Sequence, residues 1–107
     1  MTQAQAVEVV VCALDDLAVE EGRTYVVADE QVALFRMRDD TVRAVGAVCP
    51  HRGGPIADGQ CDERVVWCPL HAFGFELATG ACVNGDFTLP RWEADVRDGR
   101  VVVTIPA

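Results

Sequence analysis

Two short segments of the 107-residue sequence place a cysteine close to a histidine. The first is Cys49-Pro50-His51 and the second is Cys68-Pro69-Leu70-His71, with 16 residues between His51 and Cys68. Thiolate and imidazole are side chains that bind zinc and iron centres in proteins. The segments contain both histidines of the chain and two of its five cysteines. The pattern therefore predicts a metal site held by Cys49, His51, Cys68 and His71.

Two kinds of centre suit two cysteines and two histidines. A tetrahedral zinc ion accepts this set, but zinc sites usually combine a Cys-x-x-Cys segment with a histidine pair, whereas each segment here carries one ligand of each type. The other centre is a [2Fe–2S] cluster in which two cysteines hold one iron and two histidines hold the other. Two facing loops that each supply one cysteine and one histidine would divide the ligands in that way.

The residues around these segments resemble the Rieske family of iron–sulfur proteins. The resemblance covers nearly the whole chain and rests on a two-part motif and the segment that follows it. These are Cys49-Pro50-His51-Arg52-Gly53-Gly54-Pro55, Cys68-Pro69-Leu70-His71 and Phe75-Glu76-Leu77-Ala78-Thr79-Gly80. The resemblance implies that Cys49 and Cys68 hold the inner ferric iron of one cluster, while His51 and His71 hold the outer iron, which changes valence.

The elements expected around the ligand segments are almost all β-strands, because valine-rich runs alternate with turn residues and no long stretch has the 3.6-residue period of a helix. Asp98-Gly99 is a strong hairpin signal. The family resemblance implies an all-β fold of stacked antiparallel sheets, as one domain over residues 1–107, with a cluster-binding subdomain at about 46–90 inserted into a β base. The expected strands are 8–12, 24–28, 31–38, 41–45, 65–67, 73–77, 92–97 and 100–105.

Three cysteines lie outside the ligand segments. We interpret Cys12, Cys61 and Cys82 as small buried apolar side chains rather than ligands. The acidic neighbours of Cys61, Asp62 and Glu63, would raise the pKa of its thiol. The turn at residues 84–86 is a candidate third loop that shields the cluster.

Charge and composition exclude several classes of protein. The formal net charge of −8 argues against binding to nucleic acid, whose phosphates would be repelled. The longest apolar run, residues 9–14, is far shorter than the ~20 residues of a membrane span. An odd number of cysteines with no recognisable export signal at the N-terminus indicates the cytoplasm.

Departures from the family pattern predict a low reduction potential. Histidine in place of two thiolates gives Rieske centres potentials of about −150 to +300 mV. High-potential members carry an extra cysteine in each ligand loop, and a serine and a tyrosine that bond to cluster sulfurs. Here the extra-cysteine positions are near Gly54 and at Leu70, and the hydroxyl positions are Phe73 and Phe75. We therefore expect a potential near the bottom of the range.

The expected function is one-electron transfer, as a component of an oxidoreductase system rather than a complete catalyst. Both histidines are assigned to the cluster, which leaves none for the mononuclear iron site of an oxygenase subunit. The partners implied are a flavin-dependent NAD(P)H reductase and a terminal reductase or oxygenase. The sequence looks most like the small subunit of an NAD(P)H nitrite reductase. The alternatives are the ferredoxin component of a multicomponent aromatic-ring dioxygenase and, from a different class, a zinc-stabilised structural or interaction module.

Overall fold

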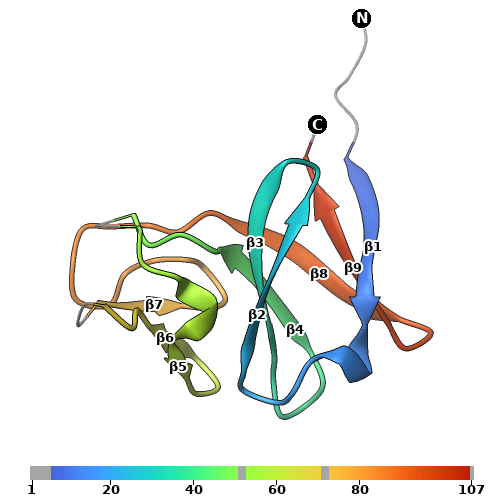
Figure 1. Ribbon diagram of the computed structural model, residues 1–107, viewed down its shortest axis with the longest axis horizontal. Helices are drawn as coiled ribbons and strands as arrows, with labels where there is room; N and C mark the ends of the chain where they lie inside the picture. The colour runs from blue at the N-terminus through green and yellow to red at the C-terminus, as the bar shows by residue number, and fades with distance from the viewer. Residues whose placement is uncertain (1–5, 51–52, 71–72, 107) are drawn as a thin grey trace, which may run out of the picture.

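A computed structural model describes residues 6–50, 53–70 and 73–106. Almost all regular structure in these residues is β, which confirms the predicted all-β fold. The strands form a large sheet, at the right in Figure 1, and a small sheet at the left. The strands are β1 (Val7–Ala13), β2 (Gly22–Val27), β3 (Glu30–Arg36), β4 (Val42–Gly46), β5 (Gln60–Cys61), β6 (Val65–Trp67), β7 (Gly74–Glu76), β8 (Arg91–Arg97) and β9 (Arg100–Ile105), and the single-turn 3-10 helices are η1 (Leu14–Asp16) and η2 (Ile56–Asp58).

The large sheet is antiparallel, with the strand order β1-β9-β8-β4-β3-β2. The predicted Asp98-Gly99 hairpin joins β8 to β9 and is confirmed. Asp98 and Gly99 have φ angles of 51° and 75°, and two successive positive φ angles are typical of the two-residue turns whose twist matches that of the flanking strands. Asp40 adopts a φ of 67° in the turn between β3 and β4. Local turn chemistry therefore determines the hairpins.

Strand β3 is buried on both faces and separates two apolar cores. Val32 and Leu34 belong to a core enclosed by the large sheet. Ala33 and Phe35 belong to a second core, which lies between the large and the small sheet. Because successive side chains of a strand point to opposite faces, the continuous apolar run of β3 supplies both cores at once.

The second core connects the small sheet to the rest of the molecule. Phe35 of the large sheet shares this core with Val66 and Phe75 of the small sheet, and all three side chains are fully buried. The small sheet has the strand order β5-β6-β7, and its strands come from the chain between β4 and β8. The predictions of strands at 65–67 and 73–77 are confirmed, with β7 shorter than expected. The two-residue strand β5 was not expected, since so short a segment has no periodicity to recognise.

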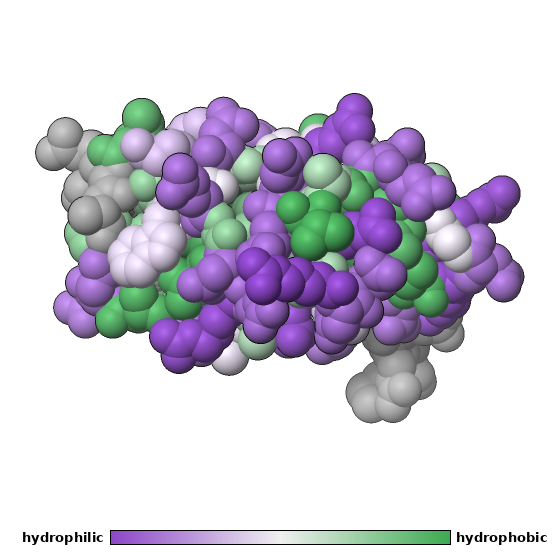
Figure 2. All heavy atoms as spheres, turned by 90° about the horizontal axis from the view of Figure 1, so that it is seen from below, coloured by the Kyte–Doolittle hydropathy of each residue, from purple (hydrophilic) through white to green (hydrophobic). Residues whose placement is uncertain are grey.

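The surface is mainly polar. Figure 2 shows hydrophilic residues over most of one face, with smaller hydrophobic patches between them. Val48, Trp67 and Leu70, next to or within the ligand segments, are exposed apolar side chains. None of the helices in the described residues is long and apolar enough to cross a membrane.

Candidate metal centre

The first ligand segment forms a closed loop after β4. The backbone N–H of Cys49 donates to the carbonyl of Gly54 at 2.8 Å, and the N–H of Gly53 donates to the carbonyl of Cys49 at 2.8 Å. Gly53 has a φ of 73°, which glycine adopts without steric cost. The Cys49 side chain is buried, with the residue only 1% exposed, so the loop holds its thiol inside the molecule. His51, the predicted histidine of this loop, lies outside the described residues.

The second ligand segment connects β6 to β7. The N–H of Cys68 donates to the carbonyl of Phe73 at 2.9 Å, which closes the loop as in the first segment. Cys68 is 4% exposed, whereas Leu70, two residues later, is 64% exposed. The loop therefore buries its cysteine and presents its leucine to solvent. The predicted ligand His71 lies outside the described residues.

The two ligand loops contact each other at Gly54. A Cβ atom built on Gly54 would lie 2.7 Å from the Sγ of Cys68 and 3.4 Å from the side chain of Leu70. Real Cβ atoms do not approach other atoms so closely, so glycine leaves space beside the thiol. Cys49 and Cys68 also belong to one buried apolar cluster. The structure thus brings together the two predicted sulfur ligands from separate loops.

A third loop, residues 82–87, packs against the second. The N–H of Cys82 donates to the carbonyl of Phe87 at 3.0 Å, so each of the three loops is closed between a cysteine and the residue five positions later. The Oδ1 of Asn84 accepts the N–H of Gly74 at 3.1 Å. The rings of Phe73 and Phe87 meet edge to face, with centroids 5.0 Å apart. The predicted turn at residues 84–86 therefore borders the second ligand loop.

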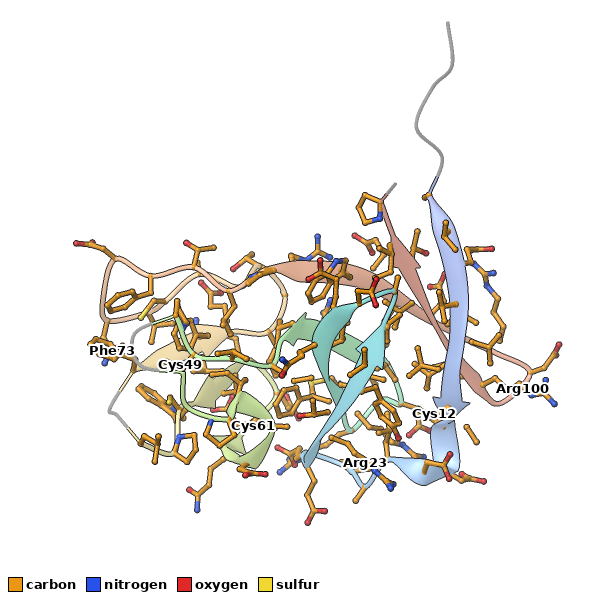
Figure 3. The ribbon with its side chains drawn as sticks, turned by 45° about the horizontal axis from the view of Figure 1, so that its top comes forward. Cys12, Arg23, Cys49, Cys61, Phe73 and Arg100 are labelled. Atoms are coloured by element: carbon orange, nitrogen blue, oxygen red, sulfur yellow. The ribbon has the colours of Figure 1, made fainter. Side chains whose placement is uncertain are left out.

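The described residues suit the sulfur side of an iron–sulfur centre. Thiolates are the common ligands of such clusters, and apolar surroundings control solvent access and the reduction potential. Figure 3 shows Cys49 among the side chains of the small-sheet end of the molecule, with Phe73 at its tip. The described residues contain no group of three or more metal-binding side chains, and both histidines that would complete the set fall outside them. The observed fit rests on Cys49, Cys68 and the space that Gly54 leaves.

Cys12, Cys61 and Cys82 are only partly buried, which corrects the expectation that they are buried side chains. The Sγ of Cys61 donates to the carbonyl of Glu20 at 3.2 Å. Burial, with the nearby charges of Glu20 and Asp62, raises the pKa of the Cys61 thiol to about 11. Burial also raises the pKa of Cys12, which lies in the large sheet, far from the ligand loops (Figure 3). None of the five cysteines, all within the described ranges, forms a disulfide.

Comparison with known families identifies the kind of metal centre that these cysteines hold. The sequence matches the Rieske [2Fe-2S] domain family over residues 7–102. The chain is a Rieske protein. Its cofactor is therefore a Rieske-type [2Fe–2S] cluster, and the resemblance read from the two-part motif is confirmed. The match spans both sheets and all three loops, so the whole fold belongs to the family.

Individual Rieske proteins are similar to the chain over most of its length. The small subunit of NADH nitrite reductase from Escherichia coli K12 is 35% identical over 99 residues, covering 85% of this chain and 91% of that protein. A crystal structure assigned as an NADH-dependent nitrite reductase small subunit from Mycobacterium tuberculosis superimposes with a TM-score of 0.89 at 33% identity, covering 96% of this chain and 98% of the other. The ferredoxin subunit of anthranilate 1,2-dioxygenase from Burkholderia cepacia is 28% identical over 95 residues, covering 87% of each.

Proposed function

We propose that the chain is a one-electron transfer subunit whose cluster is held by Cys49, His51, Cys68 and His71. The thiols bind the inner iron and the histidines bind the outer one. The observation that carries this assignment is a pair of buried cysteines in one apolar cluster, each at the start of a closed six-residue loop, with Gly54 of the first loop leaving space beside the sulfur of Cys68. The bound cluster supplies a centre that accepts and releases one electron. The chain's own residues hold the inner ligands away from water and leave Leu70 exposed for contact with a partner.

The proposed system is that of an NAD(P)H nitrite reductase, in which the chain works with a flavin-dependent NAD(P)H reductase and a terminal reductase. The chain matches 91% of the length of the Escherichia coli small subunit and 98% of the length of the Mycobacterium tuberculosis one, which supports this proposal. A ferredoxin component of a multicomponent dioxygenase is the second candidate. It is favoured because the chain matches 87% of the length of the anthranilate dioxygenase ferredoxin subunit. In both cases the relative is by name one subunit of a larger system. Family membership favours iron over the zinc alternative.

Three further proposals accompany this function. The absence of hydroxyl groups at Phe73 and Phe75 and of any disulfide among the five cysteines supports a potential near the bottom of the Rieske range. Five cysteines without a disulfide suit a reducing compartment and support a place in the cytoplasm. The core shared between both sheets supports a single domain over residues 1–107, with the cluster-binding subdomain at about 46–90.

Metal and sulfide analysis of the purified chain tests the ligand assignment. We expect two irons and two acid-labile sulfides per chain, with visible absorption, and loss of iron in Cys49→Ala and His51→Ala. Cys12→Ala is the matched control and should keep its iron, because Cys12 lies in the large sheet. A single zinc per chain, or full iron content in Cys49→Ala, would contradict the assignment.

Gel filtration with candidate partner proteins distinguishes the two systems. The proposed function predicts a stable complex with the large subunit of a nitrite reductase and NADH-dependent reduction of the chain within it. Reduction by a dioxygenase reductase, without such a complex, would instead support the ferredoxin alternative.

A further inference from the structure

A surface hollow of 340 Å³ opens beside Cys68. It is lined by Asp58 of η2, by Gln60 of β5 and by the segment Trp67, Cys68 and Pro69. Cys68 is one of the two proposed sulfur ligands, and it is otherwise buried. The hollow therefore brings the solvent-facing surface close to the proposed centre, at the junction of the small sheet and the second ligand loop.

Trp67 provides an exposed aromatic surface in this hollow. The residue is 42% exposed, and its ring lies against Gly74, where an added Cβ would come within 2.8 Å of ring atoms. Contact with the backbone of β7 limits the positions open to the indole. Tryptophan is enriched among the residues that dominate binding energy, and its ring face attracts cations. Trp67 is also joined to Cys68 by a peptide bond, so a molecule on the indole lies next to the ligand loop.

Asp58 provides a negative charge in the same hollow. Its carboxylate is exposed, and it makes no ion pair with any described residue. Its backbone N–H donates to the carbonyl of Pro55 at 3.1 Å, within the single-turn helix η2 that follows the first ligand loop. The loops 48–55 and 68–73 contain no acidic residue, although the chain carries a net charge of −8. Asp58 thus puts a negative charge beside loops that contain none.

We propose that the hollow formed by Asp58 and Trp67 is the docking site for a basic side chain, most suitably an arginine, of the protein that exchanges electrons with this chain. A guanidinium group stacks on an indole ring and donates hydrogen bonds to a carboxylate, and this pair offers both. The negative charge of the whole chain attracts the same basic surface from a distance. The inference rests on the proposed function, because it requires a cluster held in part by Cys68.

Oxidation of the reduced holoprotein by a cationic aromatic probe tests the site. The probe is tris(1,10-phenanthroline)cobalt(III): the chain loses one electron and cobalt(III) becomes cobalt(II). We expect the second-order rate constant to fall about threefold or more in Asp58→Asn and in Trp67→Leu. The rate with anionic ferricyanide should not fall. Asp29→Asn removes the same charge from a turn of the large sheet, and Trp92→Phe alters the other tryptophan; both should react with the cobalt probe like the unchanged protein.

A binding measurement gives a second readout that needs no electron transfer. Calorimetric titration with the redox-inert chromium(III) analogue should show affinity reduced by about threefold or more in Asp58→Asn and Trp67→Leu, with neither control affected. Visible absorption of each variant separates the two claims. If the cluster spectrum is intact and both variants react and bind like the controls, the docking site is wrong while the proposed function stands. If Trp67→Leu loses its cluster, Asp58→Asn, on the exposed side of the hollow, decides the result alone.

Discussion

Gly54 lies against the Sγ of Cys68, and a Cβ on Gly54 would approach that sulfur to 2.7 Å. The two residues come from different ligand loops, so this contact measures how closely the loops meet. Glycine is needed here for space rather than for an unusual backbone angle, since Gly54 is not among the residues with positive φ. The contact makes the geometry of one loop depend on the other.

Gly54→Ala should therefore lower the iron content of the protein strongly while destabilising the fold only moderately. The added methyl group pushes the Cys68 sulfur or its loop aside, because the thiol is enclosed in a packed core. We expect iron per chain to fall by about half or more, with thermal unfolding of the apoprotein destabilised by about 1–3 kcal/mol.

Gly99→Ala is the control for this prediction. It introduces strain at a φ of 75°, but no atom lies within 4 Å of the added Cβ. It should cost about 1 kcal/mol of stability and leave the iron content unchanged. Equal iron content in Gly54→Ala and Gly99→Ala would show that the Gly54 contact does not shape the site.

Removal of the Asn84 side chain should loosen the third loop. Its Oδ1 accepts the N–H of Gly74, so Asn84→Ala leaves that buried backbone donor without its partner and should cost about 1–3 kcal/mol. Asn84→Asp keeps an oxygen acceptor and should recover most of the loss. Thermal unfolding of the two variants measures the loss and its recovery. An unchanged unfolding temperature in Asn84→Ala would mean that the loop is held by other contacts alone.

Phe35 should be far more important for stability than the surface ion pair of Arg38. Phe35 is fully buried in the core between the two sheets, and Phe35→Ala should cost about 3–5 kcal/mol. Arg38 binds Glu20 at 2.7 Å, but its side chain is 68% exposed, so Arg38→Ala should cost less than about 1 kcal/mol. Chemical denaturation of both variants checks the order. Similar losses in the two variants would show that the buried Phe35 side chain contributes no more to stability than an exposed ion pair.

Cys61 should make stability decrease with pH in the alkaline range. Its thiol pKa is about 11 in the folded protein against the usual value of 9.0, chiefly because the group is partly buried. Between these values the unfolded chain releases its proton before the folded chain does, so the free energy of unfolding falls as pH rises from about 9 to about 11. Below about pH 9 the Cys61 thiol is protonated in both states, so it does not make the free energy of unfolding depend on pH.

Denaturation of the apoprotein at several pH values measures this effect. Cys61→Ser keeps a donor to the Glu20 carbonyl but removes the titrating thiol, so the decline should be shallower in the variant. The remaining slope includes Tyr25, whose pKa burial raises to about 12. Identical slopes in the two proteins would exclude a contribution from Cys61.

The features that could be predicted from the sequence are those that local chemistry determines. The four predicted ligands follow from residue type and spacing, which do not depend on the rest of the fold. The Asp98-Gly99 hairpin follows from residues that adopt positive φ readily. The β-strand content follows from valine-rich runs between turn residues. These local features identify the family and its cofactor.

Tertiary structure alone decided which distant residues meet. The run at residues 32–35 predicts a strand, but only the packing of both sheets shows that alternate residues supply two different cores. The hollow beside Cys68 needs Asp58 and Trp67, which belong to separate elements and have no sequence signal in common. The space at Gly54 likewise depends on how two loops approach, and side-chain packing across the chain sets that distance. Spacing along the sequence predicts which side chains supply the donor atoms. Three-dimensional packing determines the space around those atoms and forms the hollow beside Cys68.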